Sequence, residues 1–139
     1  MWKESVKMLY LDANVFIYAA LNQEGVGDRA RLLLKETQEG KLRASTSALT
    51  FDELVWAVRK YRNFEDAVSA GQAFLKMPRL KLVDVNGDIL SLALELMTRY
   101  RLDPRDSIHA ASSLLEKAEV IVSTDEHFDR VKEIQRRNI

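Results

Sequence analysis

The sequence predicts a single α/β domain of three layers, α/β/α, with a short and mostly parallel sheet between the helices. Two observations support this fold class. Four short apolar segments have the length and residue types of strands, and helical patterns of about 10–15 residues separate them. Crossovers of that kind join parallel strands and place helices on both faces of the sheet. With 139 residues and no linker, repeat or charge block, we expect one domain over residues 1–139.

Strands are expected where short apolar runs stop at polar residues. The first run ends abruptly at Asp12, and the last ends just before Asp125. The C-terminal sequence VKEIQRRNI suits either a helix or an edge strand, and both interpretations stay open. The four expected strands cover residues 7–11, 42–45, 80–85 and 119–123.

Helices are expected where a capping residue precedes apolar residues that recur at helical spacing. Asn14 or Asp12 can cap the first helix and Asp28 the second, while Asn63 separates two helices in the middle of the chain. The second of these ends before Pro78, because proline disfavours helical backbone in the residue that precedes it. The expected helices cover 15–21, 28–39, about 51 to 62, 63 to 77, 89–100 and 105–117.

The composition narrows the possible chemistry. There is no cysteine, which excludes disulfides, cysteine-bound zinc, iron–sulfur clusters and thiol catalysis, and fits a cytoplasmic protein. The 21 basic and 21 acidic residues cancel, so a strongly basic nucleic-acid-binding coat is excluded, although a local basic patch is not. No apolar run reaches membrane-spanning length and no signal peptide is recognisable, so we expect no membrane association. Catalysis would have to use carboxylates, hydroxyls, amides, Lys or Arg.

Four carboxylates are placed where they could share one site. Ligands of parallel sheets bind beyond the carboxyl ends of the strands, and both Asp12 and Asp125 directly follow predicted strands. Glu53 and Asp106 lie on apolar helix faces with no basic residue at the neighbouring helical positions. A carboxylate on such a face is costly to desolvate unless it is paired or bound to a metal. Together the four acids indicate a functional cluster.

Each acid taken alone also has an ordinary structural explanation. Asp12 suits a helix cap, and Asp106 suits a first-turn acid that the helix dipole favours. Glu53 suits a surface or pocket-edge acid, and Asp125 suits a loop residue. It is their combination that favours the functional interpretation.

Three further residues near these acids have less defined roles. Asp129 is either a cap or an outer member of the site, and the sequence leaves both open. His109 and His127 are interpreted as packing or surface residues rather than as ligands, because two histidines are too few for an ordinary histidine-rich zinc site.

Four segments carry the acids in order along the chain: LDANVFIY, FDELVWAV, RLDPRDSIHAA and VSTDEHF. This series resembles the PIN-domain family of ribonucleases and, in size and layout, its VapC-type toxins. The resemblance covers roughly residues 7 to 130. It assigns the four acids of the family to Asp12, Glu53, Asp106 and Asp125, and leaves Asp103 as a bystander.

The resemblance implies a metal-dependent endoribonuclease that cleaves RNA phosphodiesters with a metal-activated water. Hard oxygen ligands select Mg²⁺ or Mn²⁺ over zinc, so one or two such ions are expected. Glu53 would orient or deprotonate the water. The resemblance assigns metal binding to Asp12, Asp106 and Asp125, with Asn14 and Thr124 as hydrogen-bonding partners behind them.

The same resemblance implies three partners: an RNA substrate, an antitoxin protein, since VapC-type proteins are toxins of type II toxin–antitoxin pairs, and a second copy of the chain. Residues 49–76 carry more apolar side chains than one core-facing stripe needs, with Trp56, Phe64 and Phe74 as the surplus, and we expect a homodimer there. Tyr18, Trp56 and Phe128 are candidates for stacking on single-stranded RNA, although for Trp56 core or subunit interface is the simpler role.

Two other functions remain open from the sequence. A phosphatase-like phosphoryl-transfer enzyme would use Asp12 as its nucleophile, but that chemistry wants a second acid two residues later, where this chain has Asn14. A catalytically silent PIN-like module that only binds RNA is the other alternative. The four intact acids argue against it.

Overall fold

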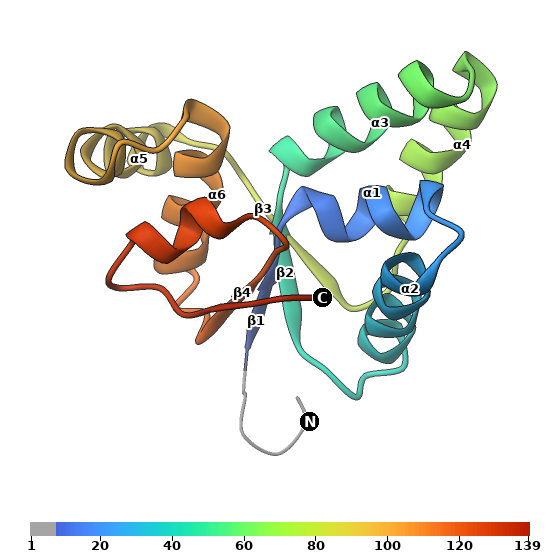
Figure 1. Cartoon of the computed structure of the whole chain (residues 1–139), viewed down its shortest axis with the longest axis horizontal. Helices are drawn as coiled ribbons and strands as arrows, with labels where there is room; N and C mark the ends of the chain where they lie inside the picture. The colour runs from blue at the N-terminus through green and yellow to red at the C-terminus, as the bar shows by residue number, and fades with distance from the viewer. Residues whose placement is uncertain (1–7) are drawn as a thin grey trace.

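A five-stranded parallel sheet forms the middle layer of residues 8–139, the part of the chain that the computed structural model describes (Figure 1). All neighbouring strands pair in parallel, and their order across the sheet is β3-β2-β1-β4-β5. The strands are β1 (Leu9–Leu11), β2 (Ala44–Ser47), β3 (Leu80–Val83), β4 (Val120–Val122) and β5 (Arg136–Arg137).

Helices cover both faces of this sheet, so the predicted three-layer α/β/α fold is confirmed (Figure 1). One layer holds the first four helices and the other holds α5 and α6 together with the 3₁₀ helix η1. The α-helices are α1 (Ala13–Leu21), α2 (Gly25–Gln38), α3 (Leu49–Tyr61), α4 (Phe64–Leu75), α5 (Gly87–Tyr100) and α6 (Pro104–Leu115), and η1 spans Glu126–Arg130. Within residues 8–139 no helix combines the length and apolar character that crossing a bilayer would require.

The central strand β1 is apolar on both faces because both faces are covered. Its side chains alternate: Leu9 and Leu11 pack in the core beneath α1 and α2, while Tyr10 packs on the side of α5 and α6. The neighbouring strand β4 alternates in the same way. The polar ends of these two strands therefore lie side by side.

Several element boundaries differ by a few residues from the sequence-based expectation. Strand β2 runs over Ala44–Ser47 rather than 42–45, because its buried hydroxyls are satisfied by main-chain oxygens: Thr46 Oγ1 donates to Leu11 O at 2.7 Å. Of the two interpretations left open for the C-terminal segment, the structure shows the edge strand, β5. Helix α2 begins at Gly25, three residues before the predicted cap. Lys7, the first residue of the first expected strand, lies outside the described residues.

The side chain that accepts hydrogen bonds from main-chain N–H groups at the start of α2 is that of Asn22, not Asp28. Its Oδ1 accepts hydrogen bonds from the N–H groups of Glu24 and Gly27, at 2.8 and 3.1 Å. Asp28 lies in the first turn and pairs with Arg31 at 2.6 Å. The Arg31 guanidinium also donates to the Asn22 carbonyl, so the α1–α2 connection is held from two sides.

The surplus apolar side chains predicted in residues 49–76 do not share one surface. Phe74 is only 3% exposed and packs edge-to-face on Phe16, at 5.2 Å between ring centroids, so its assignment to the surplus is wrong. Phe64 is exposed, as is Trp56. The side of α3 that bears Phe51 and Val55 faces α4, because both side chains lie next to Gly71.

Gly27→Ala is expected to destabilise the protein by roughly 1–3 kcal/mol, because the added Cβ would lie 2.0 Å from the Asn22 carbonyl oxygen, a main-chain atom. Gly87→Ala is the matched control, since no atom lies within 4 Å of a Cβ at that position. Urea unfolding of both variants measures the difference. Equal stability of the two variants would show that the α1–α2 connection can move to make room for the added Cβ without loss of stability.

Candidate functional site

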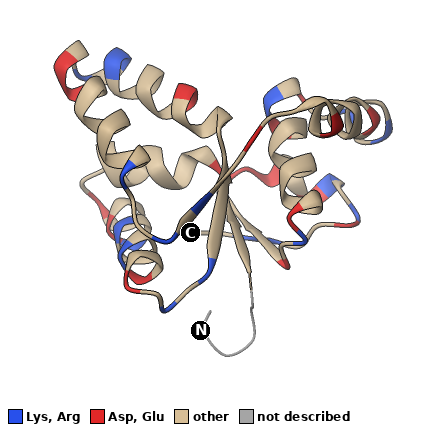
Figure 2. Ribbon diagram, turned by 180° about the vertical axis from the view of Figure 1, so that it is seen from behind, with Lys and Arg blue, Asp and Glu red and all other residues tan. Residues whose placement is uncertain are grey.

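Asp12 occupies the carboxyl end of β1, where acidic segments from both sides of the sheet converge (Figure 2). It is the N-cap of α1, and its Oδ1 accepts a hydrogen bond from the Ala13 N–H at 2.8 Å. Its Oδ2 accepts a second bond, at 2.6 Å, from the Ser123 hydroxyl just beyond β4. The Asp12 residue is only 6% exposed. The cap interpretation and the site interpretation thus apply to the same side chain.

Asn14 joins the two segments that follow β1 and β4. Its Nδ2 donates to Ser123 Oγ at 3.1 Å and to Thr124 Oγ1 at 2.9 Å, so the predicted pair of Asn14 and Thr124 is in direct contact. Its Oδ1 is buried and has no hydrogen-bond partner. A buried amide oxygen without a donor is a costly feature, and it is an oxygen ligand that a cation could use.

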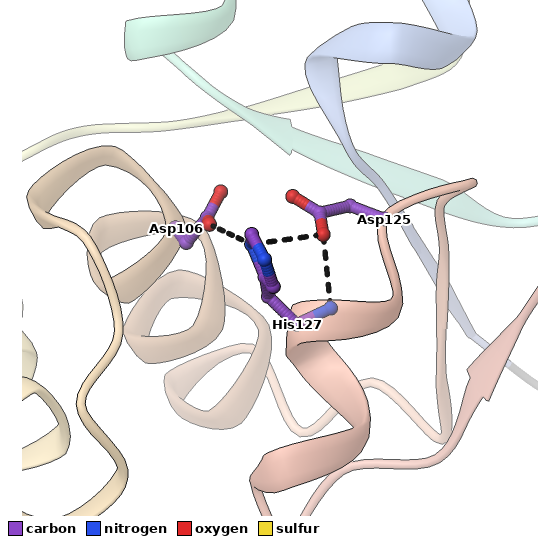
Figure 3. Close-up of side chains that lie close together, drawn as sticks. All are labelled: Asp106, Asp125 and His127. Atoms are coloured by element: carbon purple, nitrogen blue, oxygen red, sulfur yellow. Dashed lines mark hydrogen bonds and ion pairs between the residues drawn. The ribbon is translucent and has the colours of Figure 1, made fainter.

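Asp106 and Asp125 approach each other from opposite elements, with His127 between them (Figure 3). Asp106 lies in the first turn of α6, and Asp125 caps η1 by accepting from the His127 N–H at 2.9 Å. The His127 Nδ1 is 3.4 Å from Asp106 Oδ2 and 3.1 Å from Asp125 Oδ1. One ligand atom from each residue lies within 4.8 Å of the others. His127 is half exposed and lies in the acidic cluster.

Glu53 is held by a buried chain of side chains that crosses to the other face of β1. The Tyr10 hydroxyl lies 2.7 Å from His109 Nδ1, and His109 Nε2 lies 2.6 Å from Glu53 Oε1. The same Nε2 is 3.6 Å from Asp12 Oδ1. The expectation that His109 is a packing residue is correct for its burial, at 1% exposed, but it leaves out these polar contacts.

The proton positions in this chain follow from the chemistry of the partners. A carboxylate oxygen only accepts, so the hydrogen between His109 and Glu53 is on Nε2. When the imidazole is neutral, Nδ1 accepts the phenol hydrogen of Tyr10. When the imidazole is protonated, Nδ1 donates to the phenol oxygen instead. In both states His109 donates to Glu53 and fixes the direction of that carboxylate.

Burial and nearby negative charge raise the pKa values of two of these acids, Asp12 and Asp106. Burial raises the pKa of Asp12 above its ordinary value, against the opposing effects of His109 and the Ser123 hydrogen bond. Burial, together with the charges of Asp125 and Asp12, raises the pKa of Asp106 to about 6. Burial alone would lower the pKa of His109, but its hydrogen bond to Glu53 and the nearby acids raise it overall.

These features fit a divalent cation. The described side chains supply carboxylate oxygens from Asp106 and Asp125, a nearby carboxylate from Asp12 and one imidazole, and the cluster of Asp106, Asp125 and His127 is geometrically able to hold an ion. The Asn14 oxygen has no hydrogen-bond partner, and the charges of Asp125 and Asp12 add to burial in raising the pKa of Asp106. A cation would satisfy the first and relieve the second. The oxygen-rich donor set suits a hard cation.

Asp129 lies outside this cluster. Its two oxygens accept from the Arg136 guanidinium at 2.9 and 3.2 Å, which lowers the pKa of the exposed Asp129 carboxyl. Arg136 belongs to β5 and also donates to the Ser123 carbonyl at 3.0 Å. The role left open for Asp129 is therefore that of an ion-pair partner that attaches η1 to the edge strand.

The sequence pattern of the PIN domain matches residues 9–134. The chain belongs to the PIN domain family. The match spans almost the whole described chain, so the resemblance based on the four acidic segments is confirmed. No curated protein matches this PIN domain.

Solved structures agree with this PIN domain in fold. VapBC2 from Rickettsia felis, bound to a promoter DNA fragment, is 22% identical with a TM-score of 0.70 and covers 94% of this chain and 98% of that chain. VapC20 from Mycobacterium tuberculosis, a sarcin–ricin loop cleaving toxin, is 15% identical with a TM-score of 0.74 over 89% and 95%. FitAcB from Neisseria gonorrhoeae is 16% identical with a TM-score of 0.73 over 94% and 97%.

The structure of this PIN domain adds three residues that sequence reasoning did not place in the site. Ser123 binds Asp12, His109 binds Glu53, and His127 lies between two acids. Weak signals existed: His109 follows Asp106 by three residues on one helix, which puts both on a shared face. Ser123 directly follows a strand, at the same level as Asp12.

Asp106→Asn is expected to stabilise the metal-free protein, on the order of 1 kcal/mol after allowance for partial exposure. The folded-state pKa of Asp106, about 6, exceeds the unfolded value near 3.8, so its ionisation opposes folding as pH rises from about 4 to about 6. The free energy of unfolding of the variant should therefore rise relative to that of wild type between about pH 4 and pH 6. Thermal unfolding in EDTA between pH 4 and 7 measures this difference.

Millimolar Mn²⁺ should reverse the order of stability, because binding to the folded state stabilises the protein that keeps its ligands. Asp103→Asn, in the same segment but without a side-chain capping bond, is the control and should follow wild type. If Asp106→Asn were less stable at every pH in EDTA and Mn²⁺ changed nothing, Asp106 would be a structural cap.

Proposed function

We propose that this PIN domain is a metal-dependent endoribonuclease and the toxin of a type II toxin–antitoxin pair. The observation that carries the proposal is the convergence of Asp12, Asp106 and Asp125, which lie close enough that the charges of Asp125 and Asp12 help to raise the pKa of Asp106. Asn14, two residues after Asp12, adds a buried amide oxygen without a hydrogen-bond partner. Membership of the PIN family and the likeness in fold to VapC toxins support it. Such a toxin would act on RNA in the cytoplasm.

In this proposal Asp12, Asp106 and Asp125 hold one or two Mg²⁺ or Mn²⁺ ions. When bound, the metal would activate a water and neutralise charge that develops on the departing oxygen. Asn14, with Ser123 and Thr124 behind it, keeps the ends of β1 and β4 at a constant separation. Removing such supporting partners from metal sites typically costs about 10–100-fold in affinity or activity.

Glu53 is the residue that we assign to the attacking water. Its Oε1 accepts the hydrogen bond from His109, so Oε2 is the atom assigned to receive the proton of the water. The oxygen of the water bonds to phosphorus as the bond from phosphorus to the leaving ribose oxygen breaks. The leaving ribose oxygen takes up a proton from solvent, so the products are one phosphate monoester end and one hydroxyl end.

The phosphatase-like alternative is less well supported. Asp12 is nearly buried, with Ala13 N–H and Ser123 Oγ bound to its two carboxylate oxygens. Each oxygen keeps a lone pair that a small cation could reach. A nucleophile, in contrast, would need the whole phosphate group to reach the carboxylate. Asn14 supplies no second carboxylate for that chemistry, and it binds Ser123 and Thr124 instead.

RNA cleavage is expected to require a divalent cation and each of Asp12, Asp106 and Asp125. Asp→Asn at any of these positions removes a ligand charge and keeps the shape, so the rate should fall by about 100-fold or more. Structured and unstructured RNAs incubated with Mn²⁺ or Mg²⁺, with an EDTA control, provide the measurement.

The matched control for that experiment is again Asp103→Asn, which should cleave at the wild-type rate. Cleavage undiminished by EDTA would exclude the metal mechanism. A wild-type rate in one Asp→Asn variant would remove that residue from the site. RNA binding without cleavage under any metal condition would favour the silent binding module.

We also propose an antitoxin partner and a homodimer. Solved complexes of VapBC proteins share the fold of this chain, which supports an antitoxin that binds over the acidic site. For the dimer, exposed apolar side chains of the α3–α4 pair supply a face: Phe51, Phe64, Val68 and Leu75. This set replaces the sequence-based set, which included the buried Phe74.

Light scattering at micromolar concentration is expected to give the mass of a dimer. Leu75→Lys places a charge on the proposed face and should shift the mass toward the monomer, because a buried unpaired charge opposes association. Leu94→Lys, an equally exposed leucine on α5, is the control and should leave the dimer intact. A monomeric wild-type protein would contradict the dimer.

A further inference from the structure

A pocket of about 400 Å³ lies beside the acidic site, between α1, α3 and the start of α6. Its walls include the side chains of Ile17, Glu53, Trp56, Tyr61 and Arg105, and we call it the aromatic pocket. Its size falls in the range of small-ligand sites. The residue roles proposed above use only one of its members, Glu53.

The aromatic pocket is continuous with the acidic site at two points. Glu53 lines the pocket and also contacts the acidic site, because its carboxylate is bound to His109 Nε2, which lies 3.6 Å from Asp12 Oδ1. Arg105 directly precedes Asp106 in the first turn of α6. A chain whose phosphate lies at the acids therefore has its neighbouring unit at the mouth of this pocket.

Exposed aromatic rings and cations are combined around Trp56. The indole is 58% exposed and Tyr61 is 68% exposed, values unusual for rings that serve packing alone. Lys60 Nζ lies 4.9 Å from the Trp56 ring and 5.3 Å from the Tyr61 ring. A second hollow, of about 350 Å³, is lined by Trp56, Arg59 and Lys60, so the indole lies between the aromatic pocket and a basic hollow.

This surface differs from the proposed dimer face. A Cβ built on Gly71 of α4 would meet the Phe51 ring at 3.0 Å and Val55 at 3.1 Å, which shows the side of α3 that faces α4. Trp56 follows Phe51 by five residues, about 140° around the helix. The indole therefore points away from the α4 side.

We propose that the aromatic pocket binds the base of the nucleotide next to the scissile phosphate of a single-stranded RNA, with Trp56 as the stacking platform. The proposal rests on the proposed ribonuclease function and adds the form of substrate and its position. Arg105, Arg59 and Lys60 complement the flanking phosphates, and pairing exposed rings with cations is how proteins hold unpaired nucleotides. Asp52 at the wall can accept hydrogen bonds from base amino groups.

Binding in EDTA tests the pocket without cleavage. The probes are a fluorescein-labelled oligodeoxyadenylate about ten nucleotides long and an abasic phosphate–deoxyribose chain of the same length, followed by fluorescence anisotropy. Wild type should prefer the chain that carries bases. Trp56→Ala should lose that preference, with roughly a tenfold weaker affinity for the adenylate and no change for the abasic chain. Trp56→Phe should keep most of it.

Two further variants separate charge and folding from stacking. Arg105→Ala should weaken both probes alike and reduce the salt dependence of binding, because it removes a phosphate contact. Leu94→Ala, which truncates an equally exposed side chain on α5, should match wild type. Thermal unfolding of Trp56→Ala verifies that it folds, as expected for an exposed side chain.

The outcomes distinguish the pocket from the function. An unchanged base preference in folded Trp56→Ala overturns the pocket, whether or not wild type cleaves RNA. The same holds if Trp56→Ala turns the dimer into a monomer and leaves the base preference intact, because the occupant is then a second copy. Loss of the preference in Trp56→Ala supports the pocket. If wild type then fails to cleave RNA with any metal, only the ribonuclease proposal fails.

Discussion

The buried carboxylate of Asp12 is the constraint on which the rest of the site depends. It stands at the end of the central strand and accepts one hydrogen bond from the start of its own helix and one from Ser123, beyond the neighbouring strand. These bonds offset part of its desolvation and fasten the ends of β1 and β4 together. Because the two strands are paired in parallel register, Leu11 opposite Val122, everything that follows them is brought to one place.

The arrangement concentrates negative charge at the cost of stability. Burial and repulsion raise the pKa values of Asp12 and Asp106, so the ionised site opposes folding. The apolar strands LYL and VIV, buried on both faces, and the helices packed on them provide the compensating free energy. The surrounding fold therefore holds the acids in place. A bound cation would relieve the repulsion between them and is not needed to bring them together.

A buried side chain of β1 also supports the site, through His109. Tyr10 points to the opposite face of β1 from Leu9 and Leu11, and through His109 it positions Glu53 on α3. This series of hydrogen bonds begins in the core, at Tyr10, and ends in the acidic site, at Glu53. The direction of the Glu53 carboxylate thus depends on the packing of the central strand.

The sequence by itself determined the parallel α/β fold and the four acids, because both are written in local patterns: apolar strands that stop at Asp12 and before Asp125, and helices between them. Only the tertiary structure decided the partners. Tyr10 and His109 are 99 residues apart, and Asp12 and Ser123 are 111 apart, so no local period could reveal these hydrogen bonds. The serine- and threonine-rich β2 lies two residues later than the local pattern predicts, for the same reason. Its polar side chains are buried because main-chain oxygens of β1 accept hydrogen bonds from their hydroxyls. Local pattern specifies the elements, and long-range hydrogen bonding specifies the site.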